Sequence, residues 1–167
     1  MKDLGANADS VVMYFKERIY ATFTGLAIVL VATVSDHPTP AHSALLLVLG
    51  VLGITAAGFV SDIISHLTVH QDFPSRKGFV LLLRVAGGAL STMVTPLILI
   101  GLAEVDVLTI DAALVASVCV YVATLALIGW FAVRRSNIVW WKQVLALAML
   151  VVLGLLVVLL QTLAHSE

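Results

Sequence analysis

The chain has 167 residues, of which 61% are hydrophobic and only 11% are charged. A soluble domain carries about 25% charged residues, so this composition argues against a water-soluble fold and predicts an integral membrane protein. The chain has no basic tract, which argues against nucleic-acid binding. Its single cysteine, Cys119, excludes an internal disulfide.

Five apolar segments are each long enough to cross a hydrocarbon core, which needs about 20 helical residues. They lie at about residues 10–34, 41–69, 78–102, 107–133 and 138–164. Short polar segments separate them, and prolines at positions 38, 40 and 74 mark the first two boundaries because proline ends helices. The predicted fold class is therefore all-α, a bundle of five transmembrane helices that forms one domain over residues 1–167.

Apart from Arg84, the basic residues gather at alternate ends of the predicted spans. They are Lys2, Lys16 and Arg18 before the apolar part of the first span, which starts at about Ile19, Arg76 and Lys77 after the second span, and Arg134, Arg135 and Lys142 around the fourth connection. The other loops and the C-terminal tail carry acidic residues instead. Because cytoplasmic loops concentrate Lys and Arg, the pattern predicts a multi-pass protein of a bacterial cytoplasmic membrane, with its N-terminus in the cytoplasm and its C-terminus outside.

Two of the predicted spans carry polar stripes at helical spacing. Ionisable groups inside a membrane are costly, so they usually face a bundle interior or a wet cavity. The stripe residues are Thr55, Asp62, His66 and His70 in the second span, and Arg84, Ser91 and Thr95 in the third. Pro96 follows the third-span stripe and is expected to kink that helix.

Counting from the connection near Phe73 places Asp62 and Arg84 at equal distances along the two helices. In an antiparallel hairpin they would lie at similar depth, so we expect them to form an ion pair. Glu17 and Arg18, at the inner end of the first span, would complete a polar cluster near the cytoplasmic ends of helices 1–3.

Three interpretations of this cluster compete. In the first, the Asp62–Arg84 pair only holds the helices in register. In the second, the cluster is an ion or proton site, with Asp62 and Glu17 as acceptors, His66 as the titrating group and Thr55, Ser91 and Thr95 along a path. In the third, Asp62, His66 and His70 bind a metal ion, although four-coordinate zinc would need further ligands from elsewhere.

The leading functional hypothesis is a small ion or proton channel or transporter, and the alternative is a non-catalytic membrane subunit or scaffold. No nucleotide-binding or nucleophile motif is found, so neither enzymatic activity nor a cofactor is expected. Small residues in two spans favour close helix packing; they are Gly50, Gly53, Ala57, Gly87 and Gly88. The expected partners are the lipid bilayer, further copies of the chain and an unidentified membrane protein.

Overall fold

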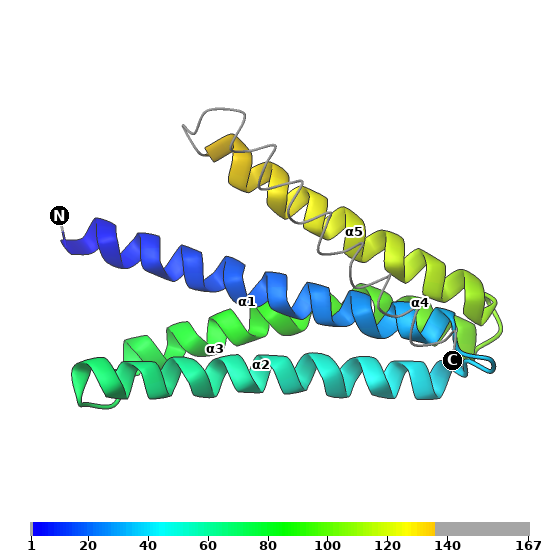
Figure 1. Cartoon of the computed structure of the whole chain (residues 1–167), viewed down its shortest axis with the longest axis horizontal. Helices are drawn as coiled ribbons and strands as arrows, with labels where there is room; N and C mark the ends of the chain where they lie inside the picture. The colour runs from blue at the N-terminus through cyan, green and yellow to red at the C-terminus, as the bar shows by residue number, and fades with distance from the viewer. Residues whose placement is uncertain (1, 136–167) are drawn as a thin grey trace, which may run out of the picture. The chain divides into compact units, whose positions relative to one another are not determined.

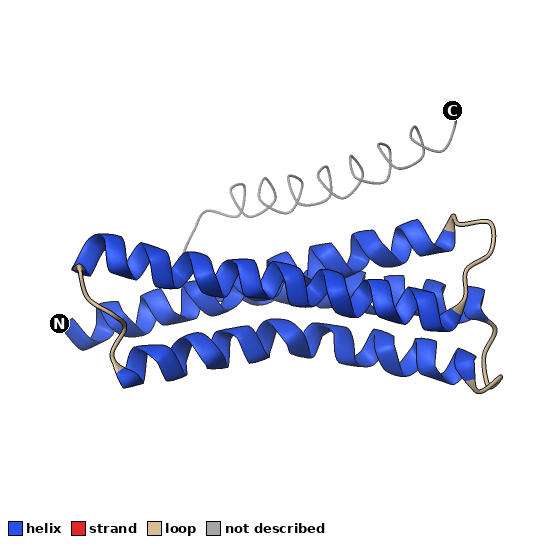
Figure 2. Cartoon of the chain, turned by 90° about the horizontal axis from the view of Figure 1, so that it is seen from below, coloured by secondary structure: helices blue, strands red, loops and turns tan. Residues whose placement is uncertain are grey.

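The computed structural model describes residues 2–135, and every regular element in this part of the chain is helical (Figure 2). The elements are α1 (Lys2–Thr33), α2 (Pro40–His70), α3 (Arg76–Leu90), the 3₁₀ turn η1 (Ser91–Met93), α4 (Val94–Glu104) and α5 (Ile110–Arg135). The all-α prediction is confirmed for these residues. The fifth predicted span, residues 138–164, lies outside the described part.

The polar segments between helices supply the caps that end and begin them. The Thr39 hydroxyl accepts a hydrogen bond from the backbone N–H of His42 (3.4 Å), and Pro40 opens α2, where a missing N–H costs nothing. At the other end of α2, Gln71 adopts a left-handed conformation (φ 52°) and donates its N–H to the Leu67 carbonyl. These local signals explain why α2 starts and stops where the sequence changes from apolar to polar.

The third apolar segment is not one continuous α-helix. The α-helix ends at Leu90, and a 3₁₀ turn leads into α4 just before Pro96. Because Pro96 has no N–H, one carbonyl of the preceding turn loses its usual partner. The hydroxyls of Ser91 and Thr92 donate to the carbonyls of Gly88 and Ala89, both at 2.7 Å. The interruption therefore falls at the place where the sequence predicts a kink.

The described residues up to Tyr121 form one compact unit. Within it, α1 packs along both α2 and α3, and α2 packs along α3 and α4 (Figure 1). Gly50 lies against Ile28 of α1, where a β-carbon would collide with the isoleucine side chain. At Gly53 and Gly87, by contrast, no described atom lies within 4 Å of the place that a β-carbon would take. Only part of the small-residue pattern therefore reflects packing within this unit.

In the described part of the chain, three helical stretches are long and apolar enough to cross a membrane. They are Pro40–Val69, Arg76–Glu104 and Ile110–Phe131. In each stretch, no more than 28% of the most apolar 18 residues is buried by the described part of the chain. Their outward faces expose large apolar side chains such as Leu45, Leu49 and Ile98. An exposed apolar area of this extent is typical of a surface that contacts a membrane or another protein.

Candidate functional site

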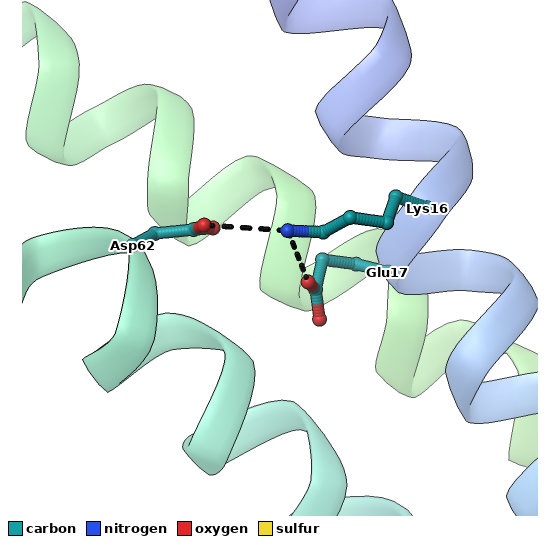
Figure 3. A network of polar contacts seen from close by, with 3 residues as sticks. All are labelled: Lys16, Glu17 and Asp62. Carbon is teal, nitrogen blue, oxygen red and sulfur yellow. Dashed lines mark ion pairs between the residues drawn. The ribbon is translucent and has the colours of Figure 1, made fainter. Parts of the chain in front are cut away.

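One lysine links two acidic side chains from neighbouring helices (Figure 3). The Lys16 ammonium of α1 lies 3.3 Å from a carboxylate oxygen of Glu17 and 3.5 Å from one of Asp62 on α2. The side chains of Glu17 and Asp62 are only 5% and 12% exposed, whereas that of Lys16 is 42% exposed. Two nearly buried carboxylates thus share one cation that keeps an open side.

The antiparallel register of α1 and α2 brings these residues together. Ile28 packs on Gly50, and Lys16 lies twelve residues before Ile28 while Asp62 lies twelve residues after Gly50. Equal steps in opposite directions along antiparallel helices reach the same depth. The Ile28–Gly50 contact and the Lys16–Asp62 pair therefore belong to one continuous interface.

Gly58 makes room for the Glu17 carboxylate. A β-carbon at position 58 would collide with both carboxylate oxygens and the carboxyl carbon of Glu17. Gly58 lies four residues before Asp62, one turn along the same face of α2. The absence of a side chain here allows a buried acid of α1 to lie directly against the α2 backbone.

The predicted Asp62–Arg84 ion pair is wrong. Among the described residues, Asp62 pairs with Lys16, and Arg84 is exposed on α3. The prediction assumed that α2 and α3 leave their connection at equal depth. The rings of Phe59 and Phe79 are in edge-to-face contact at 5.7 Å, although Phe79 is the fourth residue of α3 and Phe59 lies eleven residues before the end of α2. The loop therefore folds back along α2, and equal counting from it does not give equal depth.

Arg18 follows Glu17 in the sequence but makes a different contact. Its Nη1 donates to the Tyr14 hydroxyl at 3.0 Å, and the Tyr14 ring lies against Gly88 of α3, where a β-carbon would meet the ring. The Arg18 Nε is buried and has no hydrogen-bond partner among the described residues. Tyr14, which accepts this bond from Arg18, thus packs α1 against α3, while Lys16 ties α1 to α2.

A second buried polar group lies further along α1. Tyr121 of α5 is fully buried, its hydroxyl lies over Gly25, and that hydroxyl has no hydrogen-bond partner in the described part of the chain. Arg18, Thr22 and Gly25 follow one another at spacings of four and three residues, so they share one face of α1. The Arg18 Nε and the Tyr121 hydroxyl, which have no partner among the described residues, therefore both lie at this face of α1. Each costs about 1–3 kcal/mol of stability if it is left without water.

The remaining predicted site residues are more scattered. Thr55 is buried and donates to the Val51 carbonyl at 2.7 Å, so its hydroxyl is already engaged by its own helix. Ser91 and Thr95 are exposed on the outside of the unit, and His66 is half-buried one turn beyond Asp62.

The metal-site interpretation rested on Asp62, His66 and His70. The side chain of His70 lies outside the described part. Among the side chains that are described, no group of three or more His, Cys, Asp or Glu could hold a metal ion.

Sequence reasoning missed the role of Lys16. It counted this lysine only among the basic residues that precede the apolar part of the first span, but α1 starts at Lys2 and carries Lys16 in its middle. The twelve-residue steps from the Ile28–Gly50 contact would have identified the pair, but that contact was not evident from one sequence.

Chemically, the Lys16–Glu17–Asp62 cluster is a cation position formed by two carboxylates and filled by a tethered ammonium. A carboxylate pair of this kind can bind a proton or a small monovalent cation when the ammonium moves away. No family model matches the chain, and no curated protein or solved structure is significantly similar to it.

Proposed function

We propose that the chain is a multi-pass membrane protein that moves protons or small monovalent cations, with the Lys16–Glu17–Asp62 cluster as the ion site. The observation that carries the proposal is the single lysine shared by two nearly buried carboxylates. The proposed topology has five spans, with the N-terminus in the cytoplasm and the C-terminus outside. It is supported by the three long apolar helices and by the alternation of basic residues between successive connections.

Helix length indicates how deep the cluster would lie. The 31 residues of α2 extend about 46 Å, which exceeds a hydrocarbon core of about 30 Å. If the excess is shared between both ends, Asp62, eight residues before the end of α2, lies about 4 Å inside the core boundary. The cluster would therefore stand at the inner mouth of the bundle, where charge costs less than at the centre.

The proposed mechanism uses Lys16 as an exchangeable counterion. The lysine side chain is 42% exposed, so its ammonium can leave the carboxylates without disrupting the core. An incoming proton or cation would then be held by Glu17 and Asp62, and return of Lys16 would release it. His66, one turn from Asp62 on the same helix, is placed to exchange protons with the cytoplasmic side.

The proposed route onward follows the face of α1 that carries Arg18, Thr22 and Gly25. Buried polar groups in proteins are normally satisfied by protein or by ordered water. The Arg18 Nε and the Tyr121 hydroxyl have no protein partner among the described residues, so water at these positions would satisfy them. Such waters would extend a polar path from the cluster toward the middle of the bundle.

A scaffold is the second candidate function, and one observation favours it. Lys16 already compensates both carboxylates and joins α1 to α2, so the cluster can fix helix packing without moving an ion. In this alternative the protein would be a non-catalytic subunit of a larger membrane assembly.

Flux measurements in proteoliposomes separate the two candidates. We expect wild type to move protons, Na⁺ or K⁺ across pH 5.5 to 8, and Asp62→Asn to abolish the flux while folding and assembly persist. Asp72→Asn is the matched control, because Asp72 is an exposed loop carboxylate that accepts the N–H of Phe73 at 2.7 Å. If well-folded wild type moves none of these ions, the transport proposal fails and the scaffold becomes the better account.

A further inference from the structure

A basic depression lies on the outer side of α3, away from the cluster described above. Arg76, Lys77 and Arg84 line it together with Val80 and Leu81. The lining residues form a strip along α3, because they follow one another at four-residue spacing in two rows, 76, 80 and 84 in one and 77 and 81 in the other. Three cations thus frame an apolar floor.

No acidic side chain that the structure describes pairs with these cations. No acidic residue of the described chain lines the depression, and the ion pairs of the described residues are both made by Lys16. Asp72, in the preceding loop, uses its carboxylate to accept the N–H of Phe73 at 2.7 Å. Beyond residue 135 the sequence contains a single acid, Glu167, which the charge pattern assigns to the opposite side of the membrane.

The depth of Arg84 adds a second constraint. Arg84 lies eight residues after Arg76, about 12 Å along an apolar element that runs to Glu104. An exposed guanidinium at that depth is costly unless it reaches a polar partner at the membrane surface. Arginine side chains extend their charged ends toward the headgroup region while their stems stay against apolar surface. The Arg84 guanidinium would therefore extend toward the headgroup region, on the side where Arg76 and Lys77 lie.

We propose that this depression binds the headgroup phosphate of an anionic phospholipid, with the acyl chain lying over Val80 and Leu81. Three cations complement a phosphate, and basic pockets on the cytoplasmic side of membrane helices are suited to such headgroups. This inference rests on the membrane insertion proposed above, but not on transport.

Native mass spectrometry of the detergent-purified full chain provides the test. The probes are phosphatidylglycerol and phosphatidylcholine with identical acyl chains, and inorganic phosphate serves as a separate competitor. Each basic residue near an anionic headgroup contributes about fivefold in affinity, so Arg76→Gln/Arg84→Gln should weaken phosphatidylglycerol binding by about 25-fold. Arg84→Lys, which keeps the charge, should retain most of the binding.

Several results would overturn the proposal. They are equal binding of the two lipids, unchanged phosphatidylglycerol binding by the double variant, or displacement of the lipid by millimolar inorganic phosphate. A change of oligomeric state in the double variant without added lipid would show that a second copy covers this face instead. The thermal stability of each variant in lipid-free detergent controls for misfolding. Recovery of the chain from washed membranes tests insertion separately, and flux plays no part in the readout.

Discussion

Removing the shared lysine tests the cluster most informatively. Lys16→Met keeps much of the side-chain length but leaves the carboxylates of Glu17 and Asp62, 5% and 12% exposed, without their cation. Breaking a fully buried pair costs about 3–5 kcal/mol, whereas an exposed pair contributes about 0–1 kcal/mol. Because the lysine itself is 42% exposed, we expect an intermediate loss of about 2 kcal/mol.

The predicted loss is measurable as a fall in Tm of about 4–8 °C for a chain of this size. Thermal unfolding in one detergent, followed by circular dichroism, is the assay. Glu104→Gln is the charge-removal control, because Glu104 is exposed at the end of α4 and should change stability by no more than about 0.5 kcal/mol.

A second substitution tests whether the loss of stability comes from uncompensated charge. In Lys16→Met/Asp62→Asn, one of the two uncompensated charges is gone, so the double variant should recover at least about 1 kcal/mol of the loss. Asp62→Asn alone should cost only about 1 kcal/mol, because Lys16 keeps Glu17 as its partner. Strictly additive effects, or a loss below about 0.5 kcal/mol in Lys16→Met, would refute the shared-cation interpretation.

Three further variants probe the packing around the site. Gly58→Ala forces the Glu17 carboxylate to move and should cost about 1–3 kcal/mol. Gly53→Ala, where no described atom lies within 4 Å of the new β-carbon, should be neutral or gain up to about 1 kcal/mol from helix propensity. Equal melting temperatures for the two variants would contradict the Gly58–Glu17 contact. Gly88→Ala should likewise lower Tm, because the new β-carbon displaces the Tyr14 ring. An unchanged Tm would show that this ring does not pack against Gly88. Tyr121→Phe removes a buried hydroxyl without a described partner, so calorimetry should show unchanged or raised stability; a large loss would reveal a protein partner for that hydroxyl.

Local signals made the helices predictable from the sequence. Apolar runs bounded by Thr39–Pro40 and by Ser75 specify caps that depend only on neighbouring residues, and the structure has helices at those positions. The break before Pro96 was predictable for the same reason, since a missing N–H acts within one turn. The start of α1 was not, because its first residues are polar and carry no apolar pattern.

The partner of Asp62 could not be predicted, because it depends on the relative depth of helices. Counting from a loop gives that depth only when both helices leave the loop together, and the Phe59–Phe79 contact shows that α2 and α3 do not. The acids themselves were identified, since Glu17 and Asp62 stand out in apolar surroundings. What pairs with each acid is a tertiary property, set by contacts such as Glu17 against Gly58.

The central claim is that the nearly buried Glu17 and Asp62 form an ion site, and flux through Glu17→Gln tests it most directly. Glutamine keeps the shape that fits against Gly58 but removes the charge that Lys16 compensates. In proteoliposomes matched for protein content, we predict selective, pH-dependent flux in wild type and its loss in Glu17→Gln. Flux that is unchanged in this variant would contradict the account and place any ion path elsewhere in the protein.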